Sequence, residues 1–335
     1  MRMTILAISI VLLVTRAATA QRVGDCVVVT PESALLKTGT ESVGTIGKGN
    51  ILLVKQVKAD WLWVTFRDGR TPLKGWINRR DVISFENALD FFSDEIRRNP
   101  DARVYAIRGM IHTSKHDHES ALKDFNESLW LGPNSADVLY FRGSVWRIKG
   151  DLDNAIADFT EAIRNDSVQP SYYNDRGYVW AEKGDHDKAI ADYNEAIRLG
   201  PGEAIRFANR GTAWNAKREF EKAIADYNEV IRLDPKFPNV RRSLALILAA
   251  CPNPEIRDGK RAIEHATAAC QSAAWADAGD IFALAAAYAE AGDFKNAVMW
   301  QKYAVDIAPK AKQDFCRSVL VLYEGEKPYR GVVAK

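Results

Sequence analysis

Hydrophobic residues follow two different spacings along the chain and divide it near residue 85. Residues 27–29, 51–57 and 61–66 are short runs rich in Val, Ile, Leu and aromatic residues, and clusters of Gly, Asp and Lys separate them. Such runs predict strands joined by tight turns. From Glu86 onward the period becomes helical and continues to about residue 325. The pattern therefore predicts a small all-β domain followed by an all-α region.

The β-rich segment predicts a small barrel, because about five short strands within about sixty residues can close on themselves and leave no open sheet edge. The glycine-rich residues 44–49 resemble a phosphate-binding loop only superficially. They have too few residues between the glycines and no Ser or Thr after the Lys. A hairpin between barrel strands explains these residues better.

The spacing within residues 61–83 resembles that of bacterial SH3-like (SH3b) domains. The motif residues are Trp61-Leu62-Trp63-Val64, a hairpin tip at Asp68-Gly69, and Gly75-Trp76-Ile77 ahead of Asp81-Val82-Ile83. The resemblance implies an SH3-like barrel, and some members of that family bind cell-wall peptides. Trp63 and Trp76 are the candidate cleft residues. The alternative is that both belong to the core, the commoner place for Trp in so small a domain.

The helical region repeats itself every 34 residues. Each repeat contains a central glycine, and the residues at fixed distances from it also recur. A large residue lies four positions before this glycine, Trp or His three positions after it, Ala twelve positions after it and an aromatic residue sixteen positions after it. The repeated Arg-Gly pairs are Arg108-Gly109, Arg142-Gly143, Arg176-Gly177 and Arg210-Gly211. On these residues the region is identified as a tetratricopeptide-repeat (TPR) array, in which each repeat is a pair of antiparallel helices.

The expected fold is multidomain, with a small all-β SH3-like barrel followed by an all-α TPR superhelical solenoid. The expected segments are a signal peptide (1–20), the SH3-like barrel (21–84), a leading half-repeat helix (85–100), four TPR repeats (101–235), two degenerate TPR repeats (236–310) and a C-terminal cap helix with a tail (311–335). The first degenerate repeat lacks the glycine and carries about five extra residues in its turn, at 251–257.

The first twenty residues have the features of a secretory signal. Arg2 supplies a positive start, residues 4–14 are apolar, and Ala18-Thr19-Ala20 forms a cleavage site of small residues. The apolar run of about eleven residues is short against the roughly 20 that a spanning helix needs. We therefore expect cleavage after Ala20, in preference to an uncleaved anchor, and an exported chain, periplasmic or secreted, with no membrane span.

Charge and motifs narrow the function classes. Removing residues 1–20 takes two of the 46 Lys and Arg residues and none of the 44 Asp and Glu residues, so the mature chain holds 44 of each sign. Nucleic-acid binding needs a net or clustered basic surface, so no nucleic-acid partner is expected. No hydrolase, metalloprotease or dinucleotide fingerprint appears. We expect no enzyme activity, no cofactor and no metal.

Three groups of polar residues have structural explanations. The register places the His-rich residues 115–119 in a turn, where Asp117 is expected to cap the second helix instead of holding a metal. The cysteines lack zinc spacing; Cys251 and Cys270 are expected near opposite ends of one helix, and pairing with Cys316 stays open. Each motif Arg recurs in step with an Asp, so structural Arg–Asp pairs are expected, because an unpaired charge near a helix interface is costly. The aspartates are Asp124, Asp158, Asp192 and Asp226.

In TPR proteins the first helix of each repeat lines a concave face. The positions expected to face it lie three before, one after and four after the motif glycine. The candidate partner-binding residues are Met110, Tyr140, Ser144, Arg147, Asn174, Tyr178, Thr212 and Asn215. This mixture of aromatic, amide and hydroxyl groups suits an extended peptide. For Tyr140 and Tyr178 the alternative is packing between adjacent first helices.

Two functions follow from these features. The first is a non-catalytic extracytoplasmic scaffold that binds a partner peptide or protein in the concave TPR groove. The second is a cell-envelope module that binds peptidoglycan peptides through the SH3-like domain, with the TPR array as a spacer or oligomerisation element.

Overall fold

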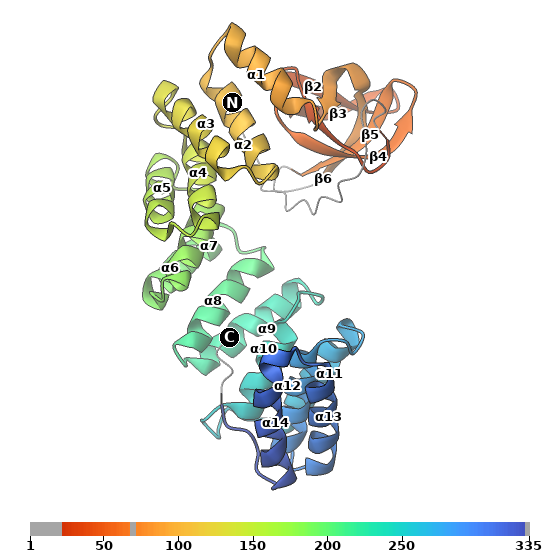
Figure 1. Cartoon of the computed structure of the whole chain (residues 1–335), viewed down its shortest axis with the longest axis vertical. Helices are drawn as coiled ribbons and strands as arrows, with labels where there is room; N and C mark the ends of the chain where they lie inside the picture. Colours follow the sequence, from red (N-terminus) through yellow and green to blue (C-terminus); the bar gives the residue numbers. More distant parts are fainter. Residues whose placement is uncertain (1–21, 68–71, 332–335) are drawn as a thin grey trace. The chain divides into compact units, whose positions relative to one another are not determined.

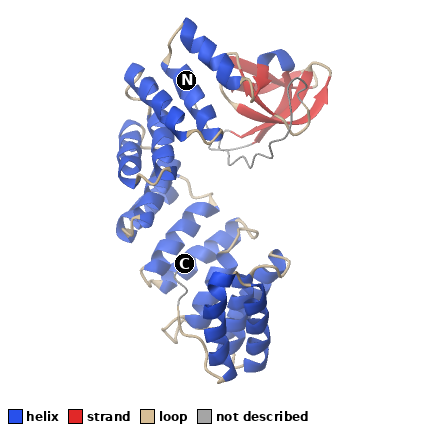
Figure 2. Ribbon diagram, in the orientation of Figure 1, coloured by secondary structure: helices blue, strands red, loops and turns tan. Residues whose placement is uncertain are grey.

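The computed structural model describes residues 22–67 and 72–331. The expected signal at residues 1–20 and the expected hairpin tip at Asp68-Gly69 lie outside these residues. The described chain begins with strands and continues with helices (Figure 1; Figure 2). It divides into two compact units between Ser167 and Val168, and each unit is described by itself.

The first unit begins with a seven-stranded antiparallel sheet in the order β3-β2-β6-β5-β4-β1-β7. One face of the sheet encloses a core of aliphatic side chains, among them Leu62, Val64 and Ile77, which are fully buried. The alternating residues between them point to the other face. The strands are β1 (Cys26–Val29), β2 (Ser33–Thr38), β3 (Glu41–Gly47), β4 (Ile51–Lys58), β5 (Trp61–Arg67), β6 (Pro72–Asn78) and β7 (Val82–Ser84).

The barrel expected from the sequence is not closed. Strands β3 and β7 end the strand order, and within the described residues they do not pair with each other. On β1, Val28 turns away from the sheet core and packs with Phe92 of α1 (Ala88–Arg98) and Ile107 of α2 (Ala102–Ser114). Because helices bury this side of the sheet, its edge is protected without closure. The chain therefore has an antiparallel sheet followed by helices.

The turn between β3 and β4 allows the sheet to pack closely against α2. Gly49 has a φ of 83°, and a Cβ at this position would lie 2.5 Å from the side chain of Ile107. The neighbouring Lys48 forms ion pairs with Glu95 of α1 and with Glu32 at 3.5 Å. Strands β3 and β4 do not pair with each other, so the expected hairpin at residues 44–49 is wrong. Residues 44–47 end β3, and the turn that follows them packs against α2.

The helices form antiparallel pairs of the TPR type in each unit. In the first unit α1 packs on α2, α2 pairs with α3, and α4 pairs with α5. In the second unit α6 pairs with α7, α8 with α9, α10 with α11 and α12 with α13, and α14 packs on α13. The remaining bounds are α3 (His118–Leu131), α4 (Ala136–Ile148), α5 (Leu152–Asn165), α6 (Pro170–Glu182), α7 (His186–Leu199), α8 (Ala204–Ala216), α9 (Phe220–Leu233), α10 (Val240–Ala250), α11 (Gly259–Ser272), α12 (Ala278–Glu290), α13 (Phe294–Ile307) and α14 (Lys310–Glu324).

The cysteines are free thiols, and their placement differs from the expectation. Cys251 follows the last residue of α10, whereas Cys270 lies in the last turn of α11. The two residues belong to different helices because Pro252 and Pro254 end the helical conformation after Ala250. Burial raises the pKa of the Cys270 thiol to about 12, so this thiol stays protonated and unreactive at neutral pH.

Candidate binding sites

The recurring Arg and Asp side chains pair as predicted. In each repeat the Nε and Nη2 groups of the Arg donate hydrogen bonds of 2.6–2.9 Å to the two oxygens of one carboxylate. The four Asp side chains are only 5–9% exposed. Each pair joins the first helix of a repeat to the second, so these charges stabilise the fold. The pairs are Arg108–Asp124, Arg142–Asp158, Arg176–Asp192 and Arg210–Asp226.

The His-rich turn is a helix cap, also as predicted. The Asp117 carboxylate accepts a hydrogen bond from the backbone N–H of Ser120 and so caps the first turn of α3. A second oxygen of the same carboxylate lies 3.2 Å from Nδ1 of His112. The equivalent caps on α5, α7 and α13 are Asp151, Asp185 and Asp293. Among residues 22–67 and 72–331, no three His, Cys, Asp or Glu side chains gather as a metal would require.

In the first unit the candidate groove residues lie on α2 and α4. Met110 and Arg147 are half-buried, and the Ser144 hydroxyl donates a hydrogen bond of 2.9 Å to the backbone oxygen of Tyr140. Tyr140 is only 8% exposed, and its ring centroid lies 5.7 Å from that of Phe159 on α5. Tyr140 is therefore a core residue, and its place in the expected groove is corrected.

In the second unit the candidate residues lie on α6 and α8. The Tyr178 ring is 41% exposed, and Thr212 also lies at the surface. Asn174 accepts a hydrogen bond of 3.1 Å from the side-chain amide of Asn209. The side-chain oxygen of Asn215 is buried and has no hydrogen-bond partner in the part of the chain that the structure describes. This unit therefore presents the exposed side chains of Tyr178 on α6 and Thr212 on α8.

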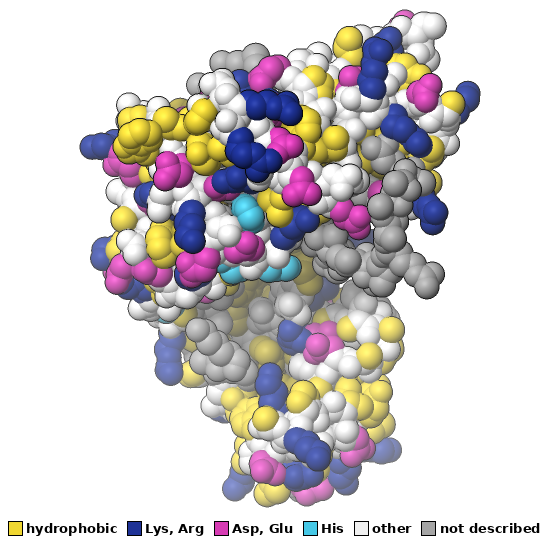
Figure 3. All heavy atoms as spheres, turned by 45° about the horizontal axis from the view of Figure 1, so that its top comes forward, with side chains coloured by type: hydrophobic (Ala, Val, Ile, Leu, Met, Phe, Trp, Pro, Cys, Tyr) yellow, Lys and Arg dark blue, Asp and Glu magenta, His cyan; other side chains and the backbone are white. Residues whose placement is uncertain are grey.

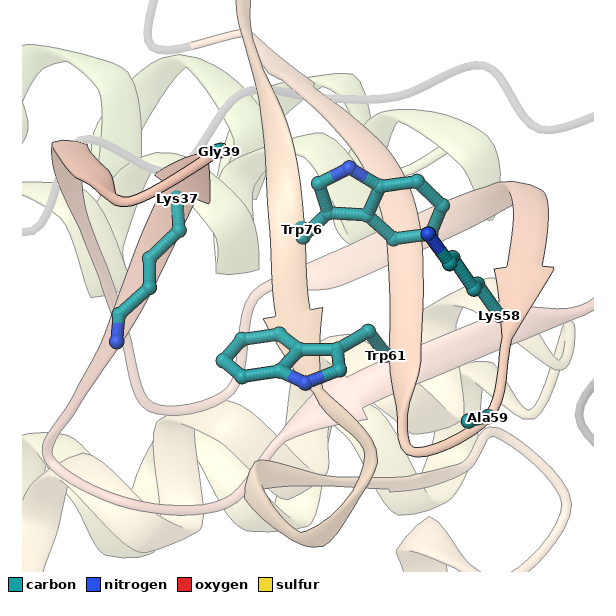
Figure 4. Close-up of a pocket in the computed structure, with 6 residues that line it drawn as sticks. All are labelled: Lys37, Gly39, Lys58, Ala59, Trp61 and Trp76. Carbon is teal, nitrogen blue, oxygen red and sulfur yellow. The ribbon is translucent and has the colours of Figure 1, made fainter.

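A cleft of about 300 Å³ lies on the outer face of the sheet (Figure 4). The indole rings of Trp61 on β5 and Trp76 on β6 line it, together with Lys37 of β2 and Lys58 of β4. The Lys37 ammonium lies 5.5 Å from the centroid of the Trp61 ring. Gly39 and Ala59 complete the lining. Flat apolar rings beside two ammonium groups suit a ligand that combines apolar surface with carboxylate groups.

The composition of this cleft was only partly predictable. Trp63 lies beside the cleft and packs edge-on against Trp76, with ring centroids 5.4 Å apart. Both rings are half-buried and point away from the sheet core. Trp61 was missed, although strand alternation places it on the same face as Trp63. Lys37 could not be found from local sequence, because only the pairing of β2 with β6 brings it opposite Trp76.

On the face shown in Figure 3, basic and acidic side chains are interspersed, without an extended patch of one sign. In the described ranges, no helix has the length and apolar character required to cross a bilayer.

Comparison with known proteins agrees with this architecture. Tetratricopeptide-repeat family models match residues 108–170, 147–204 and 208–237. The C-terminal part of a TPR repeat-containing protein from Cytophaga hutchinsonii is 19% identical, with a TM-score of 0.56 over 69% of this chain and 95% of that one. The pilF protein of Pseudomonas aeruginosa is 17% identical, with a TM-score of 0.54 over 70% and 98%. The comparison with curated proteins gives no match. At these identities the likeness concerns the fold, and with the family models it shows that the helical part of this chain contains tetratricopeptide repeats.

Proposed function

We propose that the chain is a non-catalytic scaffold that binds a peptide or protein segment on the first helices of its repeats. The observation that carries this proposal is the exposed side chain of Tyr178 on α6. A tyrosine ring supplies a rigid, partly apolar contact surface for an extended peptide. The motif arginines are already paired with carboxylates inside their repeats, so the proposal assigns them no contact with the partner.

The same proposal places the mature chain outside the cytoplasm, in the periplasm or in the secreted fraction. It rests on the positive start at Arg2, the apolar run at residues 4–14 and the small residues that end at Ala20. The partner would then be an envelope or secreted protein.

Capture of a partner from envelope extract tests the scaffold proposal. We expect Tyr178→Ala to weaken capture by about tenfold or more, the usual effect of losing an aromatic hot spot. Because the ring is 41% exposed, the thermal midpoint should fall by no more than about 3 °C. Trp130→Ala is the matched control, since this ring is 78% exposed but lies on α3, a second helix. Capture that survives Tyr178→Ala, or is lost equally in the control, would contradict the proposal.

The cleft of the β-sheet favours a second function, the binding of cell-wall peptides by an SH3-like module. The rings of Trp61 and Trp76 would contact the apolar parts of such a peptide, and Lys37 and Lys58 would face its carboxylates. In this case the helical repeats serve as a spacer or as an oligomerisation element.

Co-sedimentation with purified sacculi separates the two functions. If the cleft binds cell-wall peptides, Trp61→Ala should abolish sedimentation and leave protein capture unchanged. The full mature chain is the right material, because Val28 of the sheet packs against α1 and α2. An isolated segment of residues 21–84 would expose that apolar face. A parent chain that stays in the supernatant would remove the second function.

A further inference from the structure

The chain folds back on itself after its last helix. Beyond α14 the backbone reverses at Glu326, which has a φ of 56°, and the N–H of Lys327 donates a hydrogen bond of 2.9 Å to the oxygen of Leu322. The segment that follows, here called the tail (residues 327–331), returns to α10 and α12. Two of its side chains, Tyr329 and Arg330, make specific contacts there.

Tyr329 joins a three-ring cluster. Its ring lies edge-on to Phe282 of α12, with centroids 5.7 Å apart, and edge-on to Phe315 of α14 at 6.0 Å. The two phenylalanine rings are themselves 5.6 Å apart. Phe282 is only 5% exposed, whereas Phe315 is 44% exposed. Edge-on ring pairs at such distances are attractive beyond the area that they bury, so the two phenylalanines form a receptor for an aromatic side chain.

Arg330 binds beside this aromatic cluster. Its Nη1 donates a hydrogen bond of 3.2 Å to the backbone oxygen of Ala249 on α10 and forms an ion pair of 2.6 Å with the Glu290 carboxylate of α12. The Glu290 side chain is only 14% exposed, and its other oxygen accepts a hydrogen bond of 3.0 Å from Arg257. Arg257 in turn donates to the backbone oxygen of Cys251 at 2.9 Å. The extra turn residues 251–257 therefore hold the carboxylate that receives Arg330.

These contacts fall on the surface that the repeat register assigns to partners. Taking Ala245 and Ala285 as the equivalents of the motif glycine, Phe282 lies three positions before it and Ala249 four positions after it. Asn174 and Asn215 hold the same two positions in α6 and α8. The tail thus lies where a bound peptide is expected, and it has the usual features of one: an aromatic anchor, an adjacent cation and little regular structure.

We infer that α10 and α12 form a peptide site for an aromatic residue followed by Arg, and that the tail occupies this site as an internal ligand. A partner with the same side-chain pair must displace the tail before it binds. This inference rests on the proposed scaffold function. It adds which side chains a partner presents to α10 and α12 and how access to that site is regulated. A tethered ligand competes at an effective concentration in the millimolar range. If the free tail peptide has a dissociation constant of about 0.1 mM, the tethered tail weakens any competing peptide by about tenfold.

Binding of the tail in trans tests the inference. The receptor is the full chain carrying Tyr329→Ala and Arg330→Ala, here called the unlatched chain. The probe is a fluorescent synthetic peptide with the sequence of residues 324–335, followed by anisotropy. We expect saturable binding to the unlatched chain and binding about tenfold weaker to the parent chain. Adding Glu290→Gln to the unlatched chain should weaken binding, and a probe with Ala in place of its Tyr and Arg should not bind.

Three outcomes would overturn the inference: no saturable binding to the unlatched chain, equal binding to the parent chain, or a thermal midpoint lower by more than about 10 °C. The last outcome would make the tail an integral part of the core. The measurement uses no natural partner, so its failure leaves the capture experiment at Tyr178 intact. Failure at Tyr178 alone would remove the scaffold proposal for α6 and α8 while the trans-binding result stands.

Discussion

Arg210→Met is expected to lower the free energy of unfolding of the second unit by about 3 kcal/mol. The substitution keeps the apolar stem of the side chain but removes both hydrogen bonds to the Asp226 carboxylate. That carboxylate is only 6% exposed, so water cannot replace the lost partner fully. Asn194 also loses a hydrogen bond from Nη1 of Arg210, at 2.7 Å. Urea unfolding followed by circular dichroism measures the difference.

A double variant isolates the cause of this loss. Arg210→Met combined with Asp226→Leu should recover most of the lost stability, because an apolar pair in place of a buried ion pair is often neutral. The exposed pair Arg198–Glu195 is the matched control. Arg198→Met should change the free energy of unfolding by less than about 0.5 kcal/mol, as exposed i, i+3 pairs contribute little. A loss below about 1 kcal/mol in Arg210→Met would show that the recurring pairs are not structural.

Gly177→Val is expected to cost about 2–3 kcal/mol. Even a Cβ at this position would lie 3.0 Å from the backbone oxygen of Ala189 and 3.0 Å from the ring of Tyr193 on α7. The backbone oxygen cannot rotate away, and the ring is only 1% exposed, so α6 and α7 must separate. The better helix propensity of Val offsets only a few tenths of a kcal/mol of this cost.

Gly202→Val provides the control for the close approach of the helices. A Cβ on Gly202 would meet nothing within 4 Å, and its φ lies outside the left-handed region. We therefore expect this variant to match the parent within about 0.5 kcal/mol in the same urea experiment. Equal losses in the two variants would mean that the motif glycine is not required for packing.

The repeat period predicted the contacts inside a repeat well. Arg108 and Asp124 have equivalents at intervals of 34 residues in the next three repeats. The pairing expected in one repeat was therefore expected in all four, and the structure has all four ion pairs. The same register placed Asp117 at a helix start. Such contacts depend on helix geometry within one pair and need no knowledge of distant parts of the chain.

Contacts between distant segments were harder to predict. The sheet is open, and Val28 of β1 packs against helices that begin some sixty residues later in the sequence. Strand patterns contain no information on such a contact. For Tyr140 the repeat register predicted which face of the helix the side chain lies on. It did not predict how deeply the side chain is buried, because that depends on its contact with the ring of Phe159. Tyr329 and Arg330 follow the last helix and share no period with the repeats. Their contacts with α10 and α12 could be identified only from the path of the backbone in the structure.

Site-specific photo-cross-linking tests the central claim, that the first helices of the repeats bind the partner, most directly. A photoreactive benzoylphenylalanine replaces Tyr178 on α6 in one variant and Arg198 on α7 of the same repeat in the other. Both side chains are accessible, at 41% and 67% exposure. Position 178 should give a discrete cross-linked partner in envelope extract, with at least about tenfold less product at position 198. Equal cross-linking at both positions, or cross-linking at position 198 alone, would contradict the account.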